Sequence, residues 1–240
     1  MRGLSGRRLV HLRRPARRRR DHRPTPGQRR YRGAVADLRA RSQEKTQIDG
    51  PAGRLEIVVA DPGDDRRGYA VIAHPHPLYG GTLDNKVVQT LAKAMYALGY
   101  AAVRFNFRGV GESEGVFDEG PGELEDFLSV AEFARRRFGD AQTVLAGFSF
   151  GSYIAASAAQ QLQARQLVLI APAVGRFPLG EVPQHTLVVH GEEDDVVALG
   201  DVLDWARPQH LPVLVFPGAG HFFHGALLEL QRQVMRYCRD

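Results

Sequence analysis

The stretch Thr143–Ala155, TVLAGFSFGSYIA, decides the fold of this 240-residue chain. Its first four residues form a short apolar run that is typical of a buried strand. Gly147-Phe-Ser-Phe-Gly151 follows as a sharp turn, and the Ala-rich segment Ser152–Gln163 indicates a helix. A side chain at either glycine would collide with the neighbouring strand or helix, so both positions lack a Cβ. The stretch therefore predicts a strand, a strained turn that raises Ser149, and a helix.

The turn has the G-x-S-x-G spacing of a nucleophile elbow. Five such residues are weak evidence alone, and the strand before and helix after them supply the context that the motif requires. The N-terminus of the helix points at Ser149 and favours negative charge there, which suits an oxyanion. We predict Ser149 as a catalytic nucleophile. The alternative is a glycine-rich turn that only packs a helix on a strand.

The charge of the chain is divided unevenly along the sequence. The formal net charge is +5, but residues 1–45 hold 16 Lys and Arg against 3 Asp and Glu, whereas the remainder holds 16 against 24. An acidic body is not a nucleic-acid binder by charge, so no nucleic-acid partner is expected for it. No apolar run is long enough to span a membrane. The lone Cys238 cannot form an internal disulfide, which indicates a reducing compartment or indifference to redox state. We predict a cytoplasmic protein.

The N-terminal extension, residues 1–45, is rich in Arg and Pro and poor in apolar residues. Such a segment cannot bury enough surface to offset its ordering entropy, so we predict disorder. Three interpretations stay open: a solvated tail or misassigned start, a tether for nucleic acid or an anionic membrane, and a targeting sequence. The folded domain is predicted over residues 46–240, and its folded body should start near Gln47.

Within that domain, apolar strands alternate with amphipathic helices, which is typical of a mostly parallel sheet covered on both faces. The predicted strands are 54–60, 69–73, 101–107, 143–146, 166–171, 186–190 and 213–216, and the predicted helices are 83–98, 123–138, 152–163, 196–206 and 222–237. Ligand sites in such sheets lie beyond the carboxyl ends of the strands. Six candidate residues follow strand ends, and we expect them to lie at one edge of the sheet: His74, His76, Arg108, Ser149, Asp194 and His221.

A serine hydroxyl needs a base that accepts its proton and an acid that orients the base. In parallel α/β sheets that carry such an elbow, the three residues occur along the chain in the order serine, acid, histidine. The acid candidates lie in HGEEDD, residues 190–195, and we favour Asp194 over Asp195 because neighbours in a loop point different ways. The histidine candidates follow the last strand in GAGHFFH, residues 218–224. We favour His221 over His224, which is expected in the first turn of the closing helix.

The oxyanion requires two backbone amides. One is predicted to be Phe150, the residue after the nucleophile. The other should come from the loop His74–Gly81, HPHPLYGG, in which the two prolines have no N–H to donate. Leu78 or Tyr79 is the expected donor, and we choose Leu78. A metal site at His74-x-His76 is a weaker alternative because no further ligand set accompanies it, so we predict no metal and no cofactor.

With these residues in place, the chain resembles the α/β-hydrolase superfamily over about residues 47–240. More narrowly, it resembles small bacterial serine hydrolases that lack a lid. The blocks that carry the resemblance are HPHPLYGGTLDNKVV (74–88), FNFRGVGESEG (105–115), GFSFGS (147–152), HGEEDDVV (190–197) and GAGHFFHG (218–225). The resemblance implies an α/β-hydrolase fold without a cap domain, the roles predicted above for Ser149, Asp194 and His221, and a mainly structural turn at Arg108–Gly111.

The connection 172–184 is too short for a helical cap, which predicts an open, shallow site. An open site fits a small-molecule ester or thioester as substrate better than a long-chain lipid. The leading hypothesis is therefore hydrolysis of small carboxylic esters or thioesters through an acyl-enzyme. A peptidase on the same residues is possible. The alternative from another class is a non-catalytic or partner-regulated hydrolase-fold protein with a basic binding tail. The natural substrate and the oligomeric state are not predicted.

Overall fold

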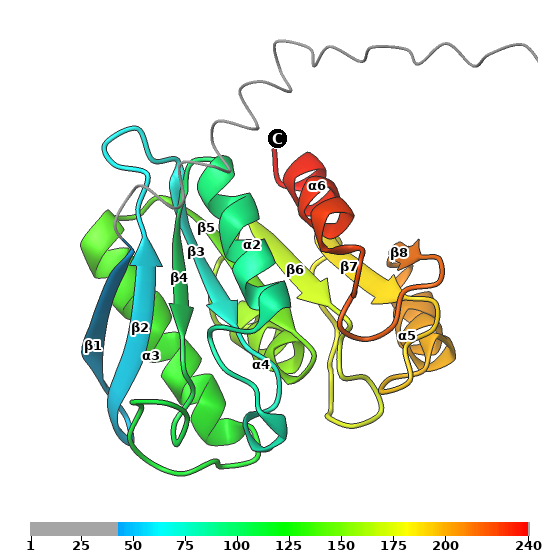
Figure 1. The fold of residues 1–240 in the computed structure, drawn as a ribbon, viewed down its shortest axis with the longest axis horizontal. Coiled ribbons are helices and arrows are strands. Elements are labelled where there is room, and N and C mark those ends of the chain that lie inside the picture. Colours follow the sequence, from blue (N-terminus) through cyan, green and yellow to red (C-terminus); the bar gives the residue numbers. More distant parts are fainter. Residues whose placement is uncertain (1–42, 240) are drawn as a thin grey trace, which may run out of the picture.

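The computed structural model describes residues 43–239, which form a three-layer α/β arrangement (Figure 1). The eight strands are β1 Glu44–Gly50, β2 Gly53–Ala60, β3 Gly68–Ala73, β4 Tyr100–Phe105, β5 Gln142–Phe148, β6 Gln166–Ile170, β7 Thr186–Gly191 and β8 Val213–Phe216. The helices are α2 Lys86–Ala97, α3 Pro121–Phe138, α4 Phe150–Ala159, α5 Leu199–Ala206 and α6 Leu227–Tyr237, with 3-10 turns η1 Pro77–Tyr79 and η2 Arg207–Gln209. The predicted α/β class is confirmed.

The strands form one sheet in the order β1-β2-β4-β3-β5-β6-β7-β8. The ladders β1–β2 and β2–β4 are antiparallel, and every other ladder is parallel. The chain passes from β3 outward to β4 and then back across β3 to β5, so the strand order reverses between β3 and β5. In open α/β sheets the crevice beyond such a reversal is where ligands bind. The loops after β3 and β5 meet there.

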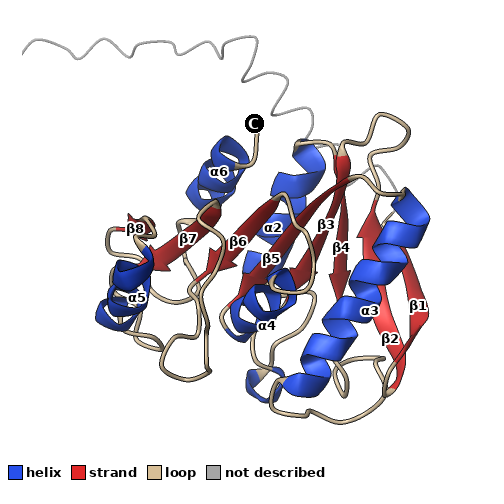
Figure 2. Ribbon diagram, turned by 180° about the vertical axis from the view of Figure 1, so that it is seen from behind, coloured by secondary structure: helices blue, strands red, loops and turns tan. Residues whose placement is uncertain are grey.

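Helices cover both faces of the sheet, α2 and α6 on one and α3, α4 and α5 on the other (Figure 2). Strand β5 shows how its sequence serves both layers. Val144, Ala146 and Phe148 pack with α2 and α6, whereas Leu145 packs with α3 and α4. This alternation follows from the two-residue repeat of a strand. It explains why β5 is apolar throughout and why it lies in the centre.

Several elements differ from the sequence prediction in their bounds, and one strand was not predicted. Strand β1 was not predicted. It begins at Glu44, inside the segment assigned to the N-terminal extension, and forms because it pairs with β2 across a tight turn. Helix α6 begins at Leu227 rather than Phe222, since Phe223 and Gly225 have φ values of 52° and 78° that no right-handed helix contains. Helix α5 begins at Leu199 rather than Val196. The predicted disorder of the extension otherwise lies outside the described residues.

The segment between β6 and β7 contains no helix within the described chain, which agrees with the predicted absence of a cap. None of the helices described in residues 43–239 combines the length and apolar character that crossing a membrane requires.

Candidate active site

The turn at Ser149 has the strained geometry that the glycine spacing predicts. Ser149 has φ 55° and ψ −118°, a region that non-glycine residues rarely adopt. A Cβ on Gly147 would lie 2.0 Å from the carbonyl oxygen of Gly151, and one on Gly151 would lie 2.5 Å from that of Ala73. The Ser149 amide donates to Ile170 O at 2.9 Å, which ties the turn to β6. Only glycine therefore fits at the positions two residues before and two residues after the serine.

Three side chains from three separate strand ends form one hydrogen-bonded chain. His221 Nδ1 lies 2.7 Å from Asp194 Oδ2, and His221 Nε2 lies 3.0 Å from Ser149 Oγ. Because a carboxylate only accepts, Nδ1 carries the proton, and Nε2 offers its lone pair to the serine hydroxyl. All three residues are at most 9% exposed. The arrangement can move a proton from Ser149 to His221 while Asp194 stays ionised.

The loop after β7 is shaped around the Asp194 carboxylate. Asp194 Oδ1 accepts the amides of Val196 and Val197, each at 2.9 Å. Helix α5 nevertheless begins only at Leu199, because the backbone of Ala198 is extended, with ψ 137°. Burial would raise the pKa of Asp194, but the hydrogen bonds from His221 and the two amides hold that pKa below its usual value. Asp195 is exposed. Of the two aspartates that the sequence offered, the structure brings Asp194 to the histidine.

Two other histidines near this loop have different surroundings. His190, at the end of β7, is fully buried, and its Nε2–H donates to Val197 O at 2.9 Å, which closes the loop behind Asp194. Sequence reasoning did not assign His190 a role, although its place at a strand end beside the acidic run was visible. His224 is exposed and lies in the turn before α6, not in the helix.

The loop after β3 is held by His74. This side chain is fully buried, and its Nε2 accepts the Phe107 amide at 3.1 Å. Nδ1 must then carry the proton, which it donates to Pro75 O at 2.6 Å. Both ring nitrogens are engaged with backbone groups, so His74 has no free lone pair for the metal site considered from the sequence. Among residues 43–239 no cluster of metal-ligating side chains is found.

The buried His74 should make stability depend on pH. Burial lowers the pKa of His74 to about 4, whereas an unfolded histidine has a pKa of about 6.5. Between those values only the unfolded chain binds the proton, so the stabilisation is complete above pH 6.5 and decreases as pH falls. We expect His74 to account for about 2 kcal/mol of the stability lost between pH 7 and pH 5.

Denaturant unfolding of the wild type and of His74→Gln at both pH values measures this contribution. The glutamine keeps an acceptor for the Phe107 amide but cannot titrate. His185→Gln, which removes an exposed histidine, is the matched control. An equal loss of stability between pH 7 and 5 in wild type and His74→Gln would show that His74 does not carry the dependence.

Within the same loop, the amides differ in availability. The Leu78 amide donates to His76 Nδ1 at 3.2 Å, so in this structure it is engaged with a side chain. The His76 amide has no backbone acceptor among residues 43–239. The Phe150 amide is the first of α4 and has no acceptor within its helix. Leu78 as oxyanion donor stays a prediction, and His76 is an amide that the sequence reasoning passed over.

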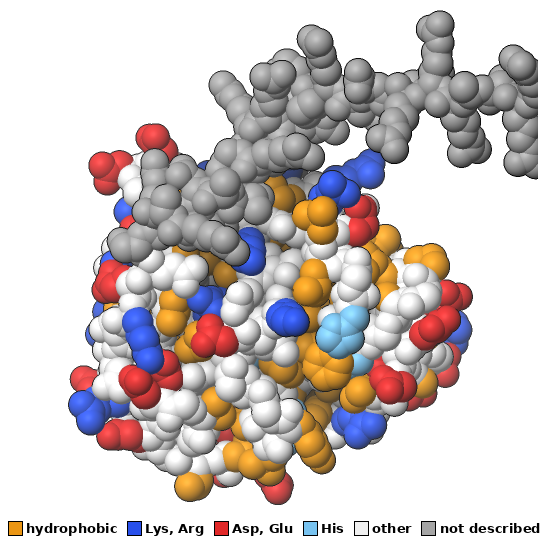
Figure 3. Space-filling model, viewed as in Figure 1, with side chains coloured by type: hydrophobic (Ala, Val, Ile, Leu, Met, Phe, Trp, Pro, Cys, Tyr) orange, Lys and Arg blue, Asp and Glu red, His pale blue; other side chains and the backbone are white. Residues whose placement is uncertain are grey.

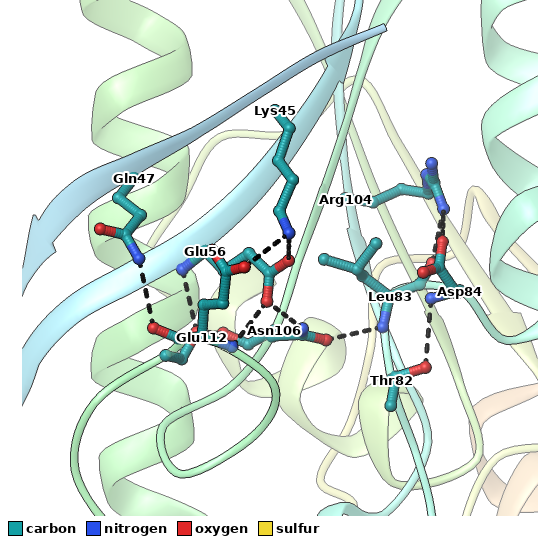
Figure 4. A network of polar contacts seen from close by, with 10 residues as sticks. Lys45, Gln47, Glu56, Thr82, Leu83, Asp84, Arg104, Asn106 and Glu112 are labelled. Carbon is teal, nitrogen blue, oxygen red and sulfur yellow. Dashed lines mark hydrogen bonds and ion pairs between the residues drawn. The ribbon is translucent and has the colours of Figure 1, made fainter.

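A polar network holds the C-terminal end of the loop after β3 in place (Figure 4). Asn106 Oδ1 accepts the Leu83 amide at 2.8 Å, and Asn106 Nδ2 donates to Glu56 Oε2 at 2.7 Å. Glu56 is buried and pairs with Lys45 at 2.8 Å. Burial raises the pKa of Glu56, but the hydrogen bonds from Lys45, the Glu112 amide and Asn106 bring that pKa below its usual value. The network links β1 and β2 to the loop beside Ser149.

The turn after β4 has a structural ion pair. Arg108 and Asp126 are both buried, and the guanidinium meets the carboxylate through Nη2 at 2.8 Å and Nε at 3.1 Å. The Arg108 amide donates to the same carboxylate at 2.9 Å. The pair ties the turn to α3, and neither residue takes part in the Ser149–His221–Asp194 chain.

Comparison with known proteins shows the family to which this chain belongs. The model of the family described as serine aminopeptidase, S33, matches residues 78–183. A serine hydrolase homologue from Coxiella burnetii is 42% identical with a TM-score of 0.77, covering 81% of this chain and 97% of that one. An α/β serine hydrolase without lid from Xanthomonas campestris is 37% identical with a TM-score of 0.78, covering 82% and 94%. An uncharacterized protein of Rickettsia prowazekii is 31% identical over 214 residues, 79% of this chain and 86% of that protein. The chain belongs to the α/β serine hydrolase family.

Proposed function

We propose that this hydrolase cleaves small carboxylic esters or thioesters through an acyl-enzyme on Ser149. The observation that carries the proposal is the hydrogen-bonded chain from Asp194 through His221 to Ser149, with distances of 2.7 and 3.0 Å. These distances lie within the range that a nucleophile, its base and an orienting acid need. The tautomer that Asp194 imposes leaves Nε2 of His221 unprotonated, as a general base requires.

In the proposed reaction, Ser149 Oγ attacks the substrate carbonyl while its proton passes to His221 Nε2. The resulting oxyanion accepts hydrogen bonds from the Phe150 amide and from a second amide in the segment 76–78. The bond to the leaving alcohol or thiol then breaks, and His221 donates its proton to that group. Water attacks the acyl-enzyme with His221 again as base, which releases the acid and regenerates Ser149.

The ester and peptidase alternatives differ in the leaving group, and this makes them testable on one protein. The purified wild type is treated with a fluorophosphonate probe and digested, and the modified peptide is identified by mass spectrometry. Turnover is measured with p-nitrophenyl acetate, acetylthiocholine and amino-acid p-nitroanilides. We expect labelling at Ser149 and turnover of the ester and thioester that greatly exceeds that of the anilides.

Faster cleavage of the anilides would favour the peptidase activity that the family description names. A folded protein that neither labels nor turns over any substrate would contradict a working acyl-transfer site. That result would favour the alternative of a partner-binding protein in which the basic N-terminal extension makes the contact.

A further inference from the structure

An aromatic shelf lies beside the nucleophile and is assembled from four separate segments of the chain. We use this name for six residues: His76, Tyr79, Phe117, Phe150, Tyr153 and Phe177. The His76 ring contacts Tyr79 and Phe117, each with 4.8 Å between ring centroids, and Phe150 at 5.1 Å. Phe177, from the connection after β6, contacts Phe150 at 4.9 Å and stacks on Tyr153 at 5.2 Å. Only Phe150 is fully buried, so the shelf keeps apolar surface exposed to solvent.

Exposed aliphatic side chains extend the shelf. Leu78 is 69% exposed, Val116 78% and the shelf residue Tyr79 85%, although all three are large and apolar. Figure 3 shows hydrophobic side chains along the lower edge of the view, where Figure 1 places η1 and the loop from β4 to α3. Several exposed apolar side chains near a candidate active site are typical of a surface that binds an apolar group.

The order of the strands separates most of this shelf from the base. Phe177 follows β6, which lies on the base side of β5, and it joins the shelf through its ring contacts with His76, Phe150 and Tyr153. Ser149 follows β5, and the shelf residues of the loops after β3 and β4 come from the strands on one side of β5. Asp194 and His221 follow β7 and β8, on the other side. His221 has its own aromatic neighbours, Phe148 at 5.0 Å and Phe222 at 5.1 Å. Among residues 43–239 no ring contact joins these two to the shelf.

The chemistry of the proposed reaction decides which half of the substrate lies on each side. His221 must donate a proton to the leaving oxygen or sulfur, so the alcohol or thiol half lies on the His221 side. The carbonyl oxygen faces the amides of Phe150 and the 76–78 segment. The acyl chain is therefore directed away from His221, and the side chains it meets there are those of the shelf.

We propose that the aromatic shelf is the acyl-binding surface, and that the substrates are esters or thioesters of short apolar acids whose chain lies on Phe117 and Phe177. This inference rests on the proposed function and adds to it the class of acid. The shelf contains no Lys or Arg, and burial lowers the pKa of its histidine, His76. It therefore offers no cationic partner at neutral pH for a charged acyl group such as a dicarboxylic half-ester. The shelf recognises the acyl chain by burying its apolar surface.

The test measures kcat/KM for p-nitrophenyl acetate, propionate, butyrate and hexanoate. Burial of a methylene on a partly exposed surface should raise kcat/KM by about two- to fourfold per methylene in the wild type. In Phe117→Ala, and in Phe177→Ala, this increment should fall towards onefold while p-nitrophenyl acetate is still turned over. Phe222→Ala removes an aromatic ring on the His221 side and should leave the increment per acyl methylene unchanged.

A second series, methyl to butyl acetate, varies the alcohol while the acyl group stays constant. The shelf variants should leave its dependence on chain length as it is in the wild type. An acyl increment that survives in both shelf variants, or one that falls in Phe222→Ala instead, would overturn the proposal. Fluorophosphonate labelling at Ser149 with a flat acyl dependence in the wild type would overturn the shelf alone, whereas absence of labelling and turnover would overturn the proposed function with it.

Discussion

Replacing Ser149 with alanine is expected to lower kcat for p-nitrophenyl acetate by about 10⁴- to 10⁶-fold and to abolish fluorophosphonate labelling. The hydroxyl is the group that forms the acyl-enzyme, and in the variant His221 can only assist water weakly. The fold should survive, because the Ser149 contact that ties the turn to β6 uses its backbone amide and not its side chain. Circular dichroism and the unfolding midpoint check this point.

Ser157→Ala is the matched control for that experiment. Ser157 lies on the same helix, α4, and its hydroxyl bonds only to Tyr153 O at 2.9 Å. Its loss should change kcat by less than about twofold, as expected for a surface substitution away from special features. If Ser149→Ala keeps most of the turnover of p-nitrophenyl acetate, the reaction does not proceed through this hydroxyl.

Asp194→Asn should lower kcat by about 10⁴-fold while KM changes little. The asparagine keeps an oxygen for the amides of Val196 and Val197, so the loop should retain its shape. Its amide group can donate to the His221 ring, however, and thereby favour the tautomer whose Nε2 carries the proton. Such a histidine cannot accept the proton of Ser149. The hydrogen bonds that keep the Asp194 pKa low also keep the wild-type carboxylate ionised at neutral pH.

The neighbouring Asp195→Asn provides a control of identical chemistry one residue away. Asp195 is exposed and has no hydrogen bond to His221, so its substitution should change kcat by less than about twofold. A large loss in Asp195→Asn together with a small loss in Asp194→Asn would reverse the assignment of the acid. Steady-state kinetics of the two variants and the wild type decide between these results.

Much of the site could be read from local sequence because its residues follow strand ends. A buried strand needs a continuous apolar run, and in a parallel sheet the ends of such runs share one edge. The run before Ser149, the acidic loop after β7 and the glycine-rich turn after β8 were therefore recognisable one by one. The steric demand at Gly147 and Gly151 is equally local, since it arises from the turn itself.

Choices that depended on distant partners were not predictable in this way. Strand β1 was missed altogether because its pairing with β2, not its polar sequence, makes it a strand. The onset of α6 was misplaced because apolar periodicity does not reveal the left-handed backbone at Phe223. The engagement of the Leu78 amide depends on how His76 lies against rings from three other segments.

The sequence by itself determined the succession of elements along the chain from β2 onward, the glycine turn around Ser149, and the small set of acids and histidines that could serve it. These follow from interactions within a few residues, namely side-chain periodicity and backbone sterics. Only the tertiary structure decided that Asp194 rather than Asp195 meets His221, that His74 and Asn106 hold the loop after β3, and that four segments combine into one aromatic shelf. Those outcomes depend on contacts between residues far apart in the chain, whose geometry is set by packing of the whole sheet and its helices.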